Sequence, residues 1–268
     1  MTIEMQTLQP DTTTTPAFIP QQTQAVVVSV VIPTYKEADN LPHIVPQVSR
    51  ALAGAKLVHE IILVDDNSQD GSDAIASTLA LDFPVRFLCR TTERGLSSAV
   101  IHGFKHAVGD VVVCMDADLS HPPDKLPELV HAILTDHADF ALGSRYVKGG
   151  STDAQWTLFR HLNSRVATLM ARPLTSIRDP MSGFFALKRD RFLAASDLNP
   201  IGYKIGLELL VKTGSRNVRE VPIHFADRTR GKSKLSARQQ WMYVLHLRRL
   251  MWYKLTHQSR TSKTVKSR

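Results

Sequence analysis

Two carboxylates, two residues apart, follow an apolar strand-like run near the middle of the chain. Asp116 and Asp118 come directly after residues 111–115, and carboxylates spaced in this way at the end of a strand can reach one centre. Carboxylate oxygens are ligands that Mg²⁺ and Mn²⁺ accept. A divalent ion there would neutralise a diphosphate that the bare carboxylates would repel. The pattern predicts metal and phosphate chemistry, and the alternative is that both residues only cap the next helix.

Two further polar clusters follow the first and second predicted strands. The first begins at Pro33 and includes Tyr35 and Glu37, and the second is Asp65 and Asp66. In an open parallel sheet, ligands bind beyond the carboxyl ends of the strands. Tyr35 could stack on a base, and Asp66 could accept hydrogen bonds from a base or a ribose. Taken singly, each cluster is also compatible with turn or cap chemistry. Together, three acidic clusters at one edge would repel each other unless cationic groups lie among them.

Basic residues that suit phosphate come later in the chain. Arg145 follows a predicted strand, and Arg160 and Ser164 lie one helical turn apart and share a face. Arginine binds phosphate oxygens as a fork, and lysine binds them as a point charge. We interpret these three residues as a cradle for an acceptor phosphate, and Arg228 and Lys234 as parts of a closing basic loop. The alternative for each is a solvated surface charge.

The elements that must position these residues alternate regularly. Continuous apolar strands that alternate with helices predict an α/β fold with a mostly parallel sheet covered by helices on both faces. The second half of the chain is less regular. Strands are expected at 26–32, 60–64, 85–89, 111–115, 140–143, 184–187 and 218–225. Helices are expected at 40–52, directly after residues 70–72, and at 96–107, 123–134, 156–170 and 207–213.

Composition divides the chain into four parts. Residues 1–25 are rich in Thr, Gln and Pro and are expected to form a disordered tail. Residues 26–235 form the predicted α/β domain. Residues 236–256 have a fair helical period with a basic polar face, which is typical of an amphipathic helix at a membrane interface; a helix packed on the domain is the alternative. Residues 257–268 are expected to be a disordered basic tail.

The overall composition narrows the class of protein. The chain has 268 residues, 43% of them hydrophobic, and a net charge of +8, which favours anionic partners. It contains neither a spanning apolar stretch nor the pattern of a signal peptide, so we expect a cytoplasmic protein that contacts membranes only from the surface. A nucleic-acid-binding protein is disfavoured, because acidic clusters lie where a phosphate backbone would have to bind. The carboxylates and the basic loop argue against a non-catalytic scaffold.

Seven motifs, in order, resemble those of the family 2 glycosyltransferases, and more closely the dolichol-phosphate (polyprenol-phosphate) mannose synthases. The similarity covers roughly residues 28–235. The motifs are residues 33–37 (PTYKE), 64–68 (VDDNS), 94–99 (RGLSSA), 116–122 (DADLSHP), 143–146 (GSRY), and 182–184 (SGF) followed by 227–234 (DRTRGKSK).

The resemblance implies a GT-A (Rossmann-like) fold and transfer of mannose from GDP-mannose to a polyprenyl (dolichyl) phosphate. Inversion at the anomeric carbon would give a β-mannosyl phosphate. It implies Mg²⁺ or Mn²⁺ held by Asp116 and Asp118, with Asp118, Arg145, Arg228 and Lys234 as the catalytic groups. The donor contacts that carry over are Pro33, Tyr35, Glu37, Val64, Asp66, Asp116, Ala117, Asp118, Arg145, Arg228 and Lys234.

Three departures leave the sugar and the base open. Lys36 stands where an Asn is common, Ser120 where a Gln is common, and Pro180-Met181 varies the usual segment before Ser182. A UDP-glucose or other UDP-sugar transferase acting on the same type of acceptor is therefore the alternative. Many relatives continue into transmembrane helices, so the terminal helix or a separate membrane protein partner would provide the anchor.

Overall fold

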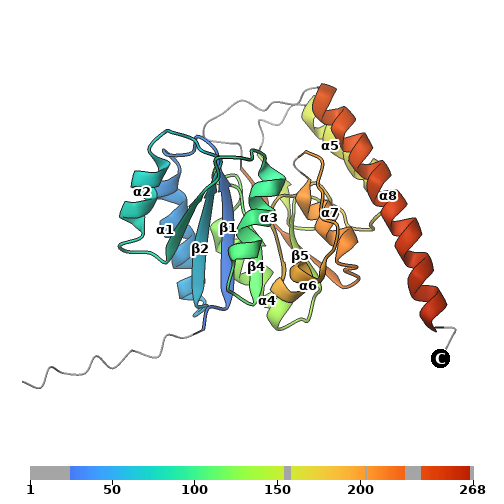
Figure 1. Cartoon of the computed structure of the whole chain (residues 1–268), viewed down its shortest axis with the longest axis horizontal. Coiled ribbons are helices and arrows are strands. Elements are labelled where there is room, and N and C mark those ends of the chain that lie inside the picture. Colours follow the sequence, from blue (N-terminus) through green and yellow to red (C-terminus); the bar gives the residue numbers. More distant parts are fainter. Residues whose placement is uncertain (1–24, 154–157, 203, 227–236, 266–268) are drawn as a thin grey trace, which may run out of the picture.

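The computed structural model of the chain describes residues 25–153, 158–202, 204–226 and 237–265. The side chains of 158–161, 237, 238 and 258–265 lie outside this description. Figure 1 shows a central sheet between helices, with a long C-terminal helix along one side. Residues 1–24 of the predicted N-terminal tail (1–25) and the predicted closing loop with Arg228 and Lys234 lie outside the described residues.

A seven-stranded sheet forms the centre of the domain, with the strand order β3-β2-β1-β4-β7-β5-β8. Every pairing is parallel except those of β7, which is antiparallel to both β4 and β5. The mostly parallel sheet predicted from the sequence is confirmed. The strands are β1 (Val28–Thr34), β2 (His59–Asp65), β3 (Val85–Cys89), β4 (Val111–Cys114), β5 (Phe140–Ser144), β7 (Phe185–Lys188) and β8 (Val218–Pro222).

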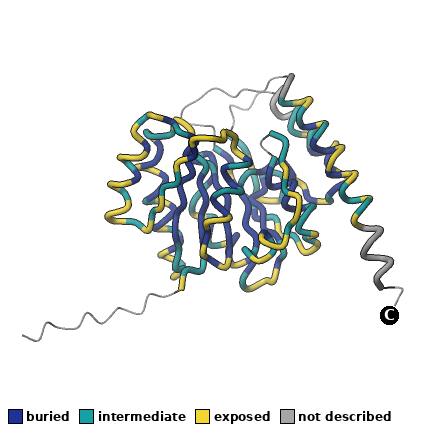
Figure 2. The backbone as a smooth tube through the Cα atoms, in the orientation of Figure 1, coloured by how far each residue is buried: buried dark blue, intermediate teal, exposed yellow. Residues whose placement is uncertain are grey.

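Helices cover both faces of this sheet, as Figure 2 shows by the buried strands between more exposed helices. Successive side chains of a strand point to opposite faces. In β1, Val30 and Ile32 pack on the first face, whereas Val31 packs on the second. The first face is covered by α1 (Leu41–Gly54), α2 (Ser72–Leu79) and α4 (Leu126–Leu134). The second is covered by α3 (Leu96–His106), α5 (Leu158–Ala171), α6 (Arg189–Ala194), α7 (Ile205–Lys212) and α8 (Ala237–Val265).

The predicted strand over residues 218–225 is wrong as one element. The chain forms β8 up to Pro222 and then β9 (His224–Phe225), which pairs with β6 (Ser151–Thr152) in a separate two-stranded sheet. Pro222 has no backbone N–H, so it cannot extend the ladder as a donor. The helix α6, the strand β6 and the short 3₁₀ helix η1 (Pro123–Lys125) were not predicted as separate elements.

The terminal helix is longer than predicted. α8 continues to Val265, through most of the segment that we expected to be a disordered tail from residue 257. The physical reason is that residues 237–265 contain no Pro or Gly and include several Arg, Lys and Gln residues, which favour helix. Among the described residues, no helix combines the length and the apolarity needed to cross a bilayer.

Candidate active site

The parallel strands β1, β2, β4 and β5 end at the same edge of the sheet, and the loops that follow them carry the predicted site. The register pairs Thr34 at the end of β1 with Asp65 at the end of β2. The backbone is unusual here: Lys36, Asn67, Gln69 and Leu119 all have φ between 53° and 62°, although none is glycine. Such left-handed residues cost about 1 kcal/mol or more each, and they concentrate at functional loops.

Asp65 organises the loops after β1 and β2. Its carboxylate accepts hydrogen bonds from Thr34 Oγ1 (3.2 Å), from the Ser68 backbone N–H (2.7 Å) and from the Ser68 hydroxyl. The Ser68 hydroxyl oxygen accepts one from the Lys36 backbone N–H at 2.9 Å. Asp65 is buried, so its role is to fix the shape of the edge.

Asp66 is held by an arginine that the sequence analysis missed. Arg90 at the end of β3 donates to Asp66 Oδ1 through Nε at 2.8 Å and also through Nη2, and the Gly95 N–H donates to Asp66 Oδ2 at 2.7 Å. Both Asp66 and Arg90 are buried. Part of the positive charge expected among the acidic clusters therefore comes from the chain itself. Any base or ribose contact of Asp66 would use the remaining acceptor capacity of its oxygens.

The carboxylate pair after β4 is also shaped by its neighbours. Asp118 Oδ1 accepts from the Ser120 backbone N–H (3.1 Å) and hydroxyl (2.5 Å). The Asp116 N–H donates to His121 Nδ1 at 3.1 Å, and the His121 ring stacks on Phe184 with centroids 5.1 Å apart. The Asp116 side chain keeps 24% of its surface exposed, so it faces the site from a firmly held turn.

The donor set at this turn fits a divalent cation. Asp116 and Asp118 supply hard oxygen ligands, and Gly183 keeps the space beside Asp116 open: a Cβ there would lie 3.6 Å from Asp116 Oδ2. Within the described part of the chain, no group of three His, Cys, Asp or Glu residues is arranged to hold a metal. A Mg²⁺-type ion commonly completes its shell with water and substrate phosphate oxygens, and two protein carboxylates match that pattern.

Arg145, at the end of β5, is fixed by a buried carboxylate. Its Nε and Nη2 donate to the two oxygens of Asp179, each at 2.7 Å, and its backbone N–H donates to Asp179 Oδ2 at 3.0 Å. Burial lowers the pKa of Arg145, but the hydrogen bond and charge of Asp179 outweigh this and raise it above its usual value. Glu220 on β8 supports the arrangement by accepting from the Asp179 N–H (3.1 Å) and the Ser144 hydroxyl (2.8 Å).

Lys204 is a second cation at this edge that the sequence analysis missed. Burial lowers its pKa to about 7, and the charge of Arg145 acts in the same direction, whereas Asp179 and Asp116 oppose the shift. Its Nζ donates to the Met181 carbonyl at 3.2 Å. Lys204 directly precedes α7 and is far in sequence from the other groups. Only its position after a Gly-Tyr pair could have marked it as part of a loop.

The other predicted donor contacts differ in what they can offer. Tyr35 is 46% exposed, and Arg94 lies 5.4 Å from its ring centroid, so an exposed aromatic face with a cation beside it is available for stacking. The side chains of Val64 and Ala117 are buried, so contact with a donor would be through their backbones. Pro33 lies in β1, near the end of the strand. Glu37 lies in the loop that follows, and its carboxylate accepts a hydrogen bond from Asn40 at 2.5 Å.

One pair of the predicted acceptor cradle is brought together, through a third residue. Tyr146, next to Arg145, donates from its hydroxyl to Ser164 Oγ on α5 at 2.7 Å. The Arg145 guanidinium lies 5.3 Å from the Tyr146 ring centroid. Arg160 belongs to α5, but its side chain lies outside the described residues.

An exposed apolar surface runs along α5 and α8, which lie side by side (Figure 1). The Tyr243 hydroxyl on α8 donates to the Ala167 carbonyl on α5 at 2.7 Å, and Lys254 Nζ donates to the Leu174 carbonyl at 3.0 Å. Their exposed apolar side chains, which we call the α5–α8 face, are Leu162, Val166, Leu169, Met170, Trp241, Val244, Met251, Trp252 and Leu255.

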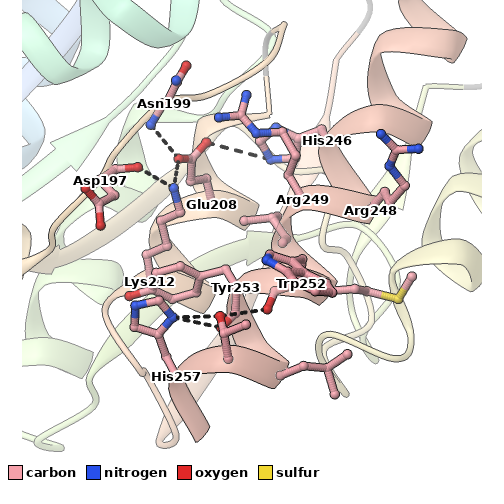
Figure 3. Close-up of a pocket in the computed structure, with 14 residues that line it drawn as sticks. Asp197, Asn199, Glu208, Lys212, His246, Arg248, Arg249, Trp252, Tyr253 and His257 are labelled. Atoms are coloured by element: carbon pink, nitrogen blue, oxygen red, sulfur yellow. Dashed lines mark hydrogen bonds and ion pairs between the residues drawn. The ribbon is translucent and has the colours of Figure 1, made fainter. Parts of the chain in front are cut away.

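A buried polar cluster holds α8 against α7 (Figure 3). Glu208 accepts from Lys212 Nζ at 2.7 Å and lies 3.9 Å from His246 Nε2, and His246 Nδ1 accepts from the Ile201 N–H at 3.1 Å. Burial, followed by nearby positive charges, lowers the pKa of His246 despite Glu208. The adjoining cavity of about 680 Å³ is lined by none of the predicted site residues within the described chain. The contacts of Glu208 and His246 thus join α8 to α7 and to the loop before α7.

The sheet and its carboxyl edge define an α/β transferase domain of the GT-A type. The model of glycosyl transferase family 2 matches residues 29–193, and the chain belongs to this family. A solved structure of glucosyl-3-phosphoglycerate synthase from Mycobacterium tuberculosis, in complex with Mn²⁺, UDP and glucosyl-3-phosphoglycerate, is similar with a TM-score of 0.59. The identity is 20%, over 81% of this chain and 76% of that one. This likeness confirms the expected fold.

Sequence relatives are more similar. The dolichol-phosphate mannosyltransferase of Pyrococcus furiosus is 46% identical over 228 residues, which is 84% of this chain and 63% of that protein, so the chain spans less than two thirds of this relative. The dolichol-phosphate mannosyltransferase of Saccharomyces cerevisiae is 46% identical over 239 residues, 84% of this chain and 87% of that protein. The predicted family and the resemblance to the mannose synthases are confirmed.

Proposed function

We propose that this chain transfers mannose from GDP-mannose to a polyprenyl (dolichyl) phosphate and inverts the anomeric carbon, giving a polyprenyl β-mannosyl phosphate. The observation that carries the proposal is the presence, at one sheet edge, of a carboxylate pair suited to a metal diphosphate together with the basic residues Arg145 and Lys204. The names of relatives about 46% identical over 84% of the chain support mannose as the sugar and dolichyl phosphate as the acceptor.

The donor is held by the first half of the sheet edge. Tyr35 stacks on the base, the backbones of Val64 and Ala117 and the side chains of Glu37 and Asp66 surround the nucleoside, and Asp116 and Asp118 hold Mg²⁺ or Mn²⁺. An ion held by Asp116 and Asp118 would supply positive charge for the diphosphate as it leaves. Lys204 is influenced by the charge of Asp116, and with a pKa of about 7 its amine is partly protonated near neutral pH. Arg228 and Lys234 lie outside the described residues, and we propose them as further positive charges for the phosphates.

The reaction itself needs no general base. A lipid monophosphate has a second pKa of about 6, so it is largely a dianion near neutral pH. Arg145, Arg160 and Ser164 hold this nucleophile in line with the anomeric carbon, and Asp179 keeps the Arg145 guanidinium in one orientation. Catalysis rests on positioning and on charge complementarity.

The α5–α8 face lies against the cytoplasmic surface of a membrane, where the acceptor's phosphate is available while its chain stays in the lipid. Apolar side chains including Leu169 (70% exposed) and Trp252 (71% exposed) would enter the interface. Arg165 on α5, Arg172 just after α5 and Arg248 on α8 are exposed and suit anionic headgroups. A separate membrane protein partner could add to this anchoring.

The experiment supplies purified protein with Mn²⁺, a short polyprenyl phosphate and either labelled GDP-mannose or labelled UDP-glucose, and counts label in the organic phase. The proposal expects transfer from GDP-mannose alone and its loss with a chelator. Transfer from UDP-glucose alone would keep the mechanism and replace the donor, which is the alternative left open by Lys36 and Ser120. Transfer from neither would contradict the proposed reaction.

A further inference from the structure

We infer that Tyr146 is a positioning residue for the acceptor phosphate, acting through Ser164 and Arg145 rather than by touching the substrate. The inference deepens the proposed function and rests on it. Its basis is that Tyr146 contacts both of the described residues of the acceptor cradle: its hydroxyl is 2.7 Å from Ser164 Oγ and its ring centroid is 5.3 Å from the Arg145 guanidinium.

The hydrogen-bond chemistry of Ser164 gives the contact a direction. A serine hydroxyl has one hydrogen and two lone pairs. Because Tyr146 donates to Ser164 Oγ, that oxygen is already an acceptor and its single hydrogen has to be given elsewhere. A phosphate oxygen is a strong acceptor for it. Tyr146 thus orients Ser164 as a donor towards the acceptor phosphate.

The ring of Tyr146 adds a second constraint. Asp179 accepts hydrogen bonds from the Nε and Nη2 atoms of Arg145, and the same guanidinium lies over the Tyr146 ring. A cation over an aromatic ring is attracted by the negative face of the ring. Tyr146 therefore sets the distance between the Arg145 guanidinium, which follows β5, and the Ser164 hydroxyl on α5.

This geometry also connects the sheet edge to the α5–α8 face. Ser164 lies in the same helix as the exposed Leu162, Val166 and Leu169. A phosphate held between Ser164 and Arg145 would consequently lie at the junction between the donor edge and the surface proposed to contact lipid. Tyr146 fixes that junction.

The test compares Tyr146→Phe with Ser164→Ala and the double variant, measuring KM for the polyprenyl phosphate and for GDP-mannose. Tyr146→Phe keeps the ring and removes only the hydroxyl. We expect its acceptor KM to rise about 5- to 10-fold, in line with a weakened hydrogen bond to a charged group, with the donor KM and the melting temperature unchanged. The double variant should match Ser164→Ala, because Tyr146 acts through Ser164.

A matched control is Tyr243→Phe, which removes another tyrosine hydroxyl bonded to α5, at the Ala167 carbonyl. It should lower the melting temperature and leave the acceptor KM unchanged. If Ser164→Ala raises the acceptor KM while Tyr146→Phe does not, the inference is wrong and the acceptor assignment stands. If Ser164→Ala also leaves it unchanged in an active enzyme, the acceptor assignment and the inference both fail. A lack of mannosyl transfer by the wild type would instead reject the proposed function.

Discussion

The two halves of the sheet edge use charge in different ways. After β1, β2 and β4, carboxylates are held by the chain's own donors: Asp65 by Ser68, Asp66 by Arg90, and Asp118 by Ser120. After β5 and before α7, the groups are the basic residues Arg145 and Lys204, and the support is the buried carboxylate Asp179. Under the proposed function, the first half would receive a cation with its diphosphate, and the second would receive an anion.

The difference extends to the helices. α1, α2 and α4 cover the first face of the sheet, whereas α5 and α8 carry a row of exposed apolar side chains on the outer side of the second. Trp252 and Leu255 on α8 are 71% and 69% exposed. Scattered exposed apolar residues are ordinary, but a row on two adjacent helices marks an interaction surface. The acceptor is expected to come from that side.

The largest effect is expected from a change to the carboxylate pair proposed to hold the metal, with the basic residues left as they are. Asp118→Asn removes the negative charge but keeps an oxygen that can accept from Ser120. We expect kcat to fall about 10³-fold, since metal stabilisation of a leaving group contributes several kcal/mol, with little loss of stability. Asp124→Asn, at an exposed carboxylate in η1, is the control and should keep full turnover. A modest fall for Asp118→Asn would reject the metal role.

The next test removes the carboxylate charge of Asp179, which holds Arg145 in the half of the edge proposed to bind an anion. Asp179→Asn leaves the Arg145 guanidinium, whose side chain is only 10% exposed, without its buried counter-charge. Breaking such a pair by removing one partner costs about 3–5 kcal/mol, so denaturant unfolding should show a loss of about 3 kcal/mol. Acceptor KM should rise as well. Unchanged stability would mean that water or another group replaces Asp179.

The α5–α8 face is tested by the double variant Leu169→Ser and Trp252→Ser. Each apolar side chain that enters lipid contributes about 1.5–3 kcal/mol, so binding to vesicles with anionic lipid should fall about 10²-fold or more. Turnover with a short acceptor in detergent should stay near the wild-type value. Leu81→Ser, at an 84% exposed leucine outside the face, is the control. Equal vesicle binding by both variants would show that another surface contacts the membrane.

The smallest expected effect is on the pH dependence of the unfolding free energy, and it comes from Lys204. The folded-state pKa of Lys204 is about 7, against 10.5 for an ordinary lysine. Between these values the unfolded chain holds a proton that the folded chain has lost, so Lys204 makes the unfolding free energy rise with pH above about 7. Below about 7 both states are protonated and the gain is absent. Lys204→Met should flatten this rise in unfolding curves from pH 6 to 9. An identical pH dependence in the variant would contradict the pKa shift.

The sequence predicts most of the sheet and the acidic half of the site, because both depend on local pattern. Where an apolar run of strand length ends in Asp65-Asp66 or Asp116-Ala117-Asp118, the neighbouring residues alone place the carboxylates at the end of a strand. Arg90, Asp179 and Lys204 were not predicted, because their roles come from pairings 24 to 34 residues away or from packing at the start of α7. The length of α8 was underestimated because a basic, polar segment without Pro or Gly can be helix or coil.

The product of the reaction tests the central claim most directly. The wild-type protein would be supplied with GDP-mannose, Mn²⁺ and a short polyprenyl phosphate, and the lipid product examined by mass spectrometry and by NMR at the anomeric carbon. A single in-line displacement by the phosphate predicts one mannose on the phosphate with the β configuration. An α-linked product, or mannose on any atom other than a phosphate oxygen, would contradict the account.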